Sequence, residues 1–467
     1  MADRQLDVWS NDQRVGSLAE ADDLWRFDYA PEWMAAEGGF NLSPFLSRDK
    51  GTHIDGASDR PVQWYFDNLL PEEAMRGVLA SEARLQAEDA FGLLAYYGAE
   101  SAGSLVLLPP GTAPAHETGL RKLELKVLNQ RILDMSTSSL TRDSPKKMSV
   151  AGAQHKLLVV FKHGYLYEPL ANTPSTHILK PNHPGETYAA SVVNEYFCMR
   201  LAALVGLNVP PVLRMYVPQP VYLIKRFDRH ADQASGATRR RHIIDTCQLL
   251  NKSRAFKYTG ATLPTLADAI EHCRSKAAAR LNLYRWLVFN FLIGNNDNHL
   301  KNVSFLQGSE GVELAPFYDM LSTQVWATKA MANEKATWPN EALTIPLGGA
   351  KQFNRASFDD LLAAGRQLGL ARATCARELG VLVRQVPVAA DRLLKAVEHE
   401  TAVLVTKSPE PDQAQIHAGG ELRLLRTIVS LIIADTTRLL APLPALQAAA
   451  PKMPRGQGPD SPYPPPK

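Results

Sequence analysis

The spacing of apolar side chains predicts an α+β fold in which strands and helices occupy different parts of the chain. Leu6 and Val8 alternate with polar residues and Val15 follows the polar segment 10–13, which predicts two strands joined by a tight turn. Aromatic-rich loops and short helical pieces continue from there to about Leu108. We therefore predict a small N-terminal α+β domain over residues 1–108, before the turn-rich stretch that follows it.

Strand patterns dominate the next part of the chain. Apolar runs typical of strands lie at residues 157–161, 165–167, 176–180 and 221–225, and a Lys-His-Gly turn joins the first two into a hairpin. A helical period runs from Ala189 to Leu204 and stops at Gly206. These elements predict a strand-rich lobe over residues 120–230.

Helical spacing prevails beyond about Arg241, including the segments 281–293 and 421–440. We predict an all-helical lobe over residues 240–440. Residues 441–467 are rich in Pro, Ala and Gly and show no periodicity, which predicts a flexible tail.

Composition narrows the class of protein. The 467 residues are 45% hydrophobic, which is typical of a globular chain with a sizeable core, and the net charge of +3 argues against a strongly basic nucleic-acid binder. The four cysteines have no C-x-x-C spacing, so structural zinc is disfavoured and reduced thiols are expected. The polar start of the chain and the interrupted apolar stretch 283–293 predict a cytoplasmic protein without a membrane span.

The segment with the clearest chemical pattern is Gly-Asn-Asn-Asp-Asn-His-Leu-Lys-Asn at residues 294–302. Asp297 and Asn302 are five positions apart, the offset of Asp and Asn in a protein-kinase catalytic loop, and Asp319 follows 17 residues later. Phosphoryl transfer needs a carboxylate that orients and deprotonates a hydroxyl, and oxygen ligands for Mg²⁺. The pattern therefore suggests Asp297 as catalytic base and the other two residues as metal ligands.

Two other interpretations of this segment are open. An Asn-rich turn after a helix is common, and Asp297 could cap the next element instead of acting in catalysis. A calcium loop is disfavoured, because Leu300 stands where that motif requires glycine.

Weaker signals upstream follow the order of the parts of a kinase. Residues 149–156 could present backbone N–H groups to phosphates, but they contain one glycine, match no standard phosphate loop and could be a plain connector. Lys180 ends a strand, as a kinase phosphate-binding lysine does, and Glu195 on the next helix could pair with it. Residues 225–228 end the last strand, at the place of a kinase hinge. This shared order favours phosphoryl transfer.

Together these motifs resemble the HipA family, the serine/threonine-protein kinase toxins of bacterial toxin–antitoxin pairs. The resemblance extends from about Leu6 to the helices near Leu440, and Asp-x-His-x-Lys-Asn at residues 297–302 is its most specific element. The other matching segments are residues 29–33, 66–71, 149–156, 178–181, 194–196, 207–210, 226–229, 247–248 and 316–319. The resemblance implies a bilobed protein-kinase-like fold and the use of ATP and Mg²⁺.

The resemblance also implies a role for each matching position. Asp297 would be the catalytic base, and Asn302 and Asp319 would bind Mg²⁺. The nucleotide would contact Ala151, Gly152, Ala153, Gln154, His155, Lys156, Lys180, Lys225, Arg226, Phe227, His299, Asn302, Tyr318 and Asp319. Ser149 corresponds to an autophosphorylated serine, whose phosphate adds up to about two negative charges beside the ATP phosphates and silences the kinase. Lys225 departs from the best-known member, which has Glu there.

Family members phosphorylate an aminoacyl-tRNA synthetase, typically glutamyl-tRNA synthetase, and so arrest growth in a persister-like state. The resemblance thus implies a synthetase as substrate. It also implies a HipB-like helix-turn-helix antitoxin, through which the chain would reach operator DNA indirectly. Homodimer contacts through the N-terminal domain are a further expectation.

Two alternative functions remain. A small-molecule phosphotransferase is disfavoured, because aminoglycoside-type kinases place His before the catalytic Asp, whereas His299 follows Asp297. A weakly catalytic, antitoxin-bound corepressor is disfavoured by the presence of Asp297, Asn302 and Asp319 together.

Overall fold

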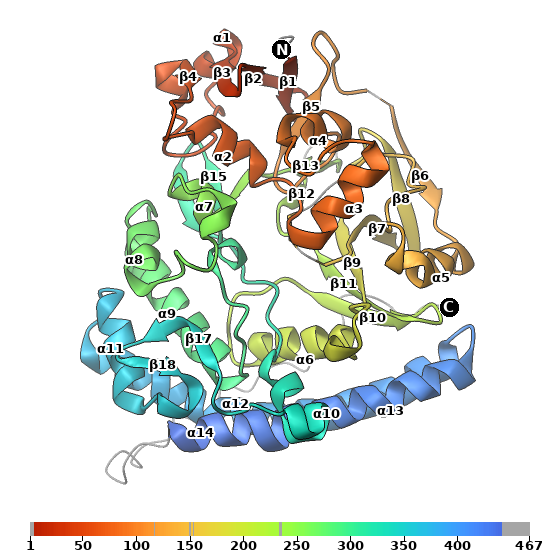
Figure 1. The fold of residues 1–467 in the computed structure, drawn as a ribbon, viewed down its shortest axis with the longest axis vertical. Helices are drawn as coiled ribbons and strands as arrows, with labels where there is room; N and C mark the ends of the chain where they lie inside the picture. The colour runs from red at the N-terminus through yellow and green to blue at the C-terminus, as the bar shows by residue number, and fades with distance from the viewer. Residues whose placement is uncertain (1–3, 116, 149–150, 153, 233–235, 441–467) are drawn as a thin grey trace.

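The computed structural model describes residues 4–115, 117–148, 151–152, 154–232 and 236–440. The predictions for Ser149, Ala153 and the tail 441–467 therefore lie outside the described residues. The rest of the chain forms an N-terminal domain, a strand-rich lobe (the N-lobe) and a mainly helical lobe (the C-lobe) (Figure 1).

The N-terminal domain is an antiparallel sheet with helices after its third strand. The strands, in the order β4-β3-β2-β1-β5, are β1 (Arg4–Ser10), β2 (Gln13–Ala21), β3 (Leu24–Tyr29), β4 (Thr52–Ile54) and β5 (Leu105–Leu108). The helices are α1 (Pro31–Ala35), α2 (Pro61–Asp67), α3 (Glu73–Ala83) and α4 (Ala90–Tyr97). Leu6 faces Leu18 across the predicted hairpin, and both are buried, as the alternation of apolar and polar residues indicated.

The N-lobe contains the predicted hairpin and the two further strands in one sheet. Its order is β10-β11-β9-β7-β8-β6, with β6 (Thr118–Lys122), β7 (Leu157–Lys162), β8 (Tyr165–Ala171), β9 (His177–Pro181), β10 (Val212–Tyr216) and β11 (Pro220–Lys225). Helix α5 (Leu125–Leu133) precedes β7, and α6 (Ser191–Leu204) follows β9. Helix α6 ends before Gly206, whose φ of 81° is the left-handed conformation that favours glycine at a helix end.

The C-lobe differs from the expectation of an entirely helical lobe. Its helices are α7 (Thr246–Leu249), α8 (Leu263–Glu271), α9 (Lys276–Leu292), α10 (Lys329–Ala332), α11 (Phe358–Gln367), α12 (Arg372–Lys407), α13 (Pro411–Thr427) and α14 (Ala434–Leu439), the last two joined by a π-helical turn, Ile428–Ile433. Short strands lie among them: β14 (Ile243–Asp245), β15 (Ser304–Gly308), β16 (Gly311–Leu314), β17 (Ala342–Leu347) and β18 (Ala350–Gln352). A hairpin of β12 (Arg229–Ala231) and β13 (Thr238–Arg240) precedes the lobe. Three of these strands, β14, β16 and β18, have only three or four residues and show too few alternations to be distinguished from loops in a sequence.

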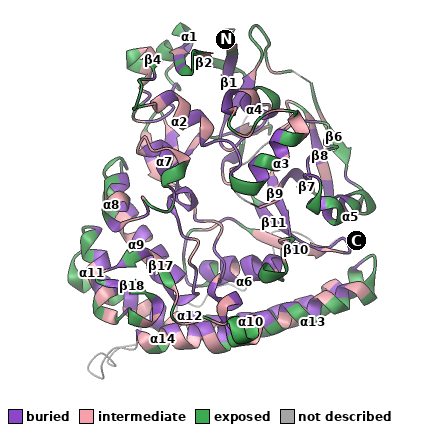
Figure 2. Ribbon diagram, viewed as in Figure 1, coloured by how far each residue is buried: buried purple, intermediate pink, exposed green. Residues whose placement is uncertain are grey.

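Most of the apolar core is continuous from the N-terminal domain through α6 to the C-lobe helices. Figure 2 shows α6 almost wholly buried, whereas α5 is exposed over much of its surface. All four cysteines are buried and free, in agreement with the expectation of reduced thiols. Within the described ranges, no helix is both long and apolar enough to cross a membrane.

A buried cluster of charges joins the N-terminal domain to the N-lobe. Glu100 is fully buried, and its carboxylate accepts a hydrogen bond from Lys146 Nζ at 2.5 Å. It also lies 3.2 Å from the guanidinium of Arg229 and 3.6 Å from those of Arg226 and Arg240. These cations hold the pKa of Glu100 well below its usual value, against the opposing effect of its burial.

We expect Glu100→Gln to lower the free energy of unfolding by about 3–5 kcal/mol, because the substitution leaves buried cations without their counter-ion. Chemical denaturation measures this change. The control is Glu88→Gln, at an exposed position of the same domain, which should change stability by less than about 0.5 kcal/mol. Equal stability of the two variants would show that Glu100 does not stabilise the contact between the N-terminal domain and the N-lobe.

Candidate active site

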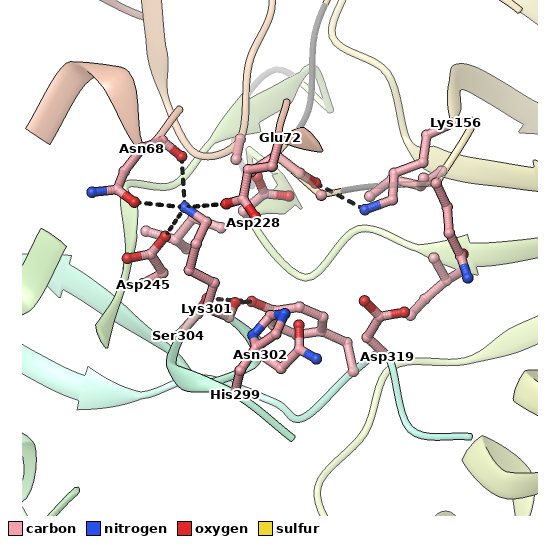
Figure 3. Close-up of a pocket in the computed structure, with 18 of the residues that line it drawn as sticks. Asn68, Glu72, Lys156, Asp228, Asp245, His299, Lys301, Asn302, Ser304 and Asp319 are labelled. Carbon is pink, nitrogen blue, oxygen red and sulfur yellow. Dashed lines mark hydrogen bonds and ion pairs between the residues drawn. The ribbon is translucent and has the colours of Figure 1, made fainter. Parts of the chain in front are cut away.

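A pocket lies where the N-terminal domain, the N-lobe and the C-lobe meet. The predicted residues that line it are Ala151, Gly152, Gln154, Lys156, Lys180, Lys225, Arg226, Phe227, Asp297, His299, Asn302, Tyr318 and Asp319. His155 belongs to the same loop but is not among the lining residues. Figure 3 shows Lys156 and Asp319 on one side of the pocket and His299, Asn302 and Lys301 on another.

The strongest electrostatic feature of the pocket is an ion triad around Lys180. Lys180 is on β9, inside the N-lobe sheet, and its Nζ donates to the two carboxylate oxygens of Glu195 at 2.8 and 2.9 Å. It also donates to Asp319 Oδ1 at 2.5 Å. The ammonium holds the pKa of Asp319 far below its usual value although burial opposes this, and the two carboxylates raise the pKa of Lys180. The pairing with Glu195, which the sequence only allowed, is thus present in the structure.

A second lysine approaches the same region from the 151–156 segment. Lys156 Nζ donates to the backbone carbonyl of Ala151 at 2.8 Å, which closes the segment into a tight loop. Gly152 within it has a φ of 120°, a conformation that L side chains rarely adopt. Burial and the nearby charge of Lys180 lower the pKa of Lys156. The pocket therefore holds two lysines that could face an anionic ligand.

Hydrogen bonds from asparagine side chains hold the loop after α9 in its conformation. Asn295 donates to Asn290 Oδ1 at 2.6 Å, and its own Oδ1 accepts the backbone N–H of Asp297 at 2.9 Å. Asn302 Nδ2 donates to the backbone carbonyl of Asp297 at 2.6 Å and so closes the loop. Because the short helical turn Leu300–Asn302 is capped at His299, Asp297 does not act as its cap. Its carboxylate instead lines the pocket.

The Asp297 carboxylate lies at the mouth of the pocket, and its side chain is 41% exposed. Tyr258 Oη donates to its Oδ1 at 2.7 Å, and His299 Nε2 lies 3.8 Å from the same oxygen. The ring of Tyr258 packs edge-on against the ring of His299, with centroids 4.9 Å apart. Partial desolvation raises the pKa of Asp297, while His299 and Tyr258 oppose the rise. A carboxylate in this setting can accept a proton from a hydroxyl that enters the pocket.

Two oxygen atoms in the pocket suit a hard cation. The Oδ1 of Asn302 and the Oδ2 of Asp319 accept no hydrogen bond from any residue in the described part of the chain. Asp319 has a φ of 57°, a left-handed backbone conformation that is uncommon for a residue other than glycine. Within the described ranges, no group of three or more His, Cys, Asp or Glu side chains could hold a metal ion. The two oxygens therefore fit Mg²⁺ only if phosphate or water oxygens complete its coordination.

The predicted hinge is anchored by its side chains. Arg226 is buried and donates to both carboxylate oxygens of Asp228, at 2.9 and 2.6 Å, so that its charge is neutralised inside the fold. Its backbone N–H donates to the carbonyl of Thr176 at 2.9 Å. Phe227 stacks on Tyr318, with centroids 5.7 Å apart and ring planes 30° apart. Lys225 is exposed at the end of β11.

Sequence reasoning missed a whole wall of the pocket. This wall consists of residues to which we had assigned no chemical role: Asn68, Leu69, Glu72, Asp245, Gln248, Lys257, Tyr258, Lys301 and Ser304. Three of them come from the N-terminal domain, more than 200 positions from the catalytic loop in sequence. The only signal in the sequence was that residues 66–71 and 247–248 belong to motifs of the resembling family.

Comparisons with known proteins match this chain to HipA domains and to kinases. Residues 6–108 match the HipA N-terminal domain, and residues 148–390 match the HipA-like C-terminal domain. The chain is 34% identical to the putative kinase Y4mE of Sinorhizobium fredii over 336 residues, which cover 69% of this chain and 78% of that protein. It is 30% identical to the serine/threonine-protein kinase toxin HipA of Shewanella oneidensis over 391 residues, which cover 79% and 86%.

Comparison of the fold with solved structures also finds a HipA protein. A chain of the solved Shewanella oneidensis complex of HipA, HipB and operator DNA superposes with a TM-score of 0.71 at 26% identity, covering 93% of this chain and 99% of that one. This match confirms the bilobed, kinase-like fold with its additional N-terminal domain. From both domain matches, in the same order, and from these identities we conclude that the chain belongs to the HipA family of kinases.

Proposed function

We propose that this chain is an ATP- and Mg²⁺-dependent serine/threonine-protein kinase and the toxin of a toxin–antitoxin pair. The observation that carries the proposal is that Asp297 lines the same pocket as the ion triad of Lys180, Glu195 and Asp319. A base and a phosphate-binding charge pair are the two parts that phosphoryl transfer requires of a protein.

In the proposed reaction, the hydroxyl oxygen of a substrate serine attacks the γ-phosphorus of ATP. The bond from that phosphorus to the bridging oxygen breaks, and ADP leaves with the electron pair. Asp297 accepts the hydroxyl proton, while Lys180 and Lys156 offer positive charge to the phosphates. Mg²⁺, held by Asn302 and Asp319 together with phosphate oxygens, supplies further neutralisation of the phosphate charge when bound.

The partner in this proposal follows the structural relative, and the substrate follows the resemblance of the motifs to the HipA family. We propose an aminoacyl-tRNA synthetase, in the first place glutamyl-tRNA synthetase, as the protein that receives the phosphate. A HipB-like antitoxin is proposed as the neutralising partner, because the structural relative was solved with HipB and operator DNA. Phosphorylation of Ser149 is proposed to end activity, since it places negative charge next to the 151–156 loop.

We expect Asp297→Asn to lower phosphate transfer by about 10²–10⁴-fold, because an amide cannot accept the hydroxyl proton. The measurement is transfer from labelled ATP to purified glutamyl-tRNA synthetase, with thermal unfolding to show that ATP still binds. Asp268→Asn, an exposed position on α8, serves as control and should transfer at the wild-type rate. Undiminished transfer by Asp297→Asn would refute the assignment of the base.

We expect Lys180→Met to weaken ATP binding by about 10- to 100-fold, because a charge-assisted contact to phosphate is lost and two buried carboxylates remain unpaired. Titration calorimetry with a non-hydrolysable ATP analogue measures the dissociation constant. Lys162→Met, on exposed Lys162 at the end of the neighbouring strand β7, is the matched control. An unchanged constant for Lys180→Met would exclude this lysine from the phosphate site.

Ser149→Ala should retain ATP binding and transfer but lose self-inactivation, because the site of the inhibitory charge is removed. Mass spectrometry after incubation with ATP, combined with activity over time, tests this expectation. Ser309→Ala, at an exposed turn between β15 and β16, is the control and should still inactivate. A wild-type preparation that loses activity without phosphate on Ser149 would contradict the prediction.

A further inference from the structure

The wall of the pocket supplied by the N-terminal domain contains a contact to the catalytic loop that the proposed reaction does not yet explain. Lys301 is buried, and its Nζ donates to the backbone carbonyl of Asn68 at 2.9 Å and to Asn68 Oδ1 at 2.8 Å. It donates as well to Asp245 Oδ2 at 2.6 Å and lies 3.4 Å from Glu72 Oε1 (Figure 3). Two of these three partners belong to the N-terminal domain.

These contacts give Lys301 a structural role. Its ammonium group donates to Asn68 and Asp245, and neither of these residues is a proposed ligand of Mg²⁺ or phosphate. Asp245 and Glu72 raise the pKa of Lys301, so the group stays charged in its buried position. Lys301 therefore differs from Lys180, whose partner Asp319 is a proposed metal ligand, and from Lys156, which donates to the carbonyl of Ala151 in the predicted phosphate loop.

The position of Lys301 in the loop connects it to the residues that would act on ATP. It directly precedes Asn302 and is four positions after Asp297. Its backbone carbonyl accepts a hydrogen bond from Tyr318 Oη at 2.8 Å, and Tyr318 directly precedes Asp319. Restraining Lys301 thus restrains both segments that carry the proposed base and metal ligands.

The side chain of Asn68 is itself fixed by two hydrogen bonds to backbone carbonyls. Its side chain is buried, and its Nδ2 donates to the backbone carbonyl of Trp64 at 2.8 Å and to that of Lys252 at 3.0 Å. The first bond fixes it to the end of α2, and the second fixes it to the chain after α7. With Oδ1 on Lys301, both ends of the amide are used, so that its orientation is determined.

Glu72 extends the same contact surface. Its carboxylate accepts a bond from Lys257 Nζ at 2.5 Å, next to the Tyr258 that contacts Asp297. Its backbone N–H lies 3.5 Å from the carbonyl of Gly152 in the predicted phosphate loop. Lys301 and Lys257 together lower the pKa of Glu72 although burial opposes this. The N-terminal domain therefore contacts the catalytic loop, the predicted phosphate loop and Lys257, and Asn68 carries no charge but accepts two of the three hydrogen bonds of Lys301.

We propose that Asn68 is a positioning residue of the kinase reaction, which holds Asp297 and Asn302 in place through the side chain of Lys301. This inference rests on the proposed function. It assigns to the N-terminal domain a positioning part in catalysis, in addition to any part it has in binding partners. A residue that positions the loop without touching ATP should affect the rate of transfer and leave nucleotide affinity unchanged.

The test compares substitutions of Asn68 in the full chain. We expect Asn68→Ala to lower kcat for phosphate transfer by about 10- to 100-fold, with the KM for ATP within about twofold of wild type. Asn68→Gln keeps both an amide oxygen for Lys301 and an amide nitrogen for the carbonyls of Trp64 and Lys252, and should hold kcat to within about threefold of wild type. Asp67→Asn is the matched control, because Asp67 is one position away and pairs with Arg76 and Arg254 but does not touch Lys301. It should transfer at the wild-type rate.

The results separate this inference from the function on which it rests. An Asn68→Ala variant that folds and keeps the wild-type kcat overturns the inference, as does one whose KM for ATP rises while kcat is unchanged. If Asn68→Ala does not fold, as judged by thermal unfolding, the folded Asn68→Gln variant decides, and a loss of about 100-fold in its kcat overturns the inference. Absence of transfer by the wild type and by every variant would instead refute the proposed kinase function.

Discussion

The buried triad of Lys180, Glu195 and Asp319 is the interaction on which the arrangement of the pocket depends. Its members come from a strand of the N-lobe sheet, from the buried helix α6 and from the C-lobe, so one cluster of charges joins the two lobes. Charges at this depth are tolerated only when they are paired. The pairing therefore fixes the relative position of the lobes and at the same time leaves a carboxylate oxygen of Asp319 open to the pocket.

Charge pairing also joins the N-terminal domain to both lobes. Glu100 balances cations of the N-lobe and hinge, and Glu72 balances lysines of the C-lobe. The apolar core continues across the same boundary. The domain is consequently part of one folded body, and its docking and the shape of the pocket depend on the same contacts.

Membership of the HipA family places these contacts in a wider context. Family models match both the N-terminal and the C-terminal domain of this chain, and the structural relative, solved in a complex with HipB and operator DNA, covers 93% of it. Within this shared frame, exposed Lys225 at the hinge is a departure noted from the sequence. The Arg226 side chain is held by Asp228, and its backbone N–H by the carbonyl of Thr176, so this residue is fixed in the fold where it lines the pocket.

The sequence by itself determined the order of the domains, the N-terminal hairpin, the N-lobe strands, the long helices and the Asp297 to Asn302 motif, because each is encoded by local periodicity or by spacing within a few residues. Short strands such as β14 were missed, since three residues carry almost no periodicity. Only the tertiary structure decided that Glu195 is buried on Lys180, that Tyr258 contacts Asp297, and that Asn68 contacts Lys301. These pairs are separated by 15, 39 and 233 positions, and no local pattern specifies which distant polar groups must meet to satisfy buried charge.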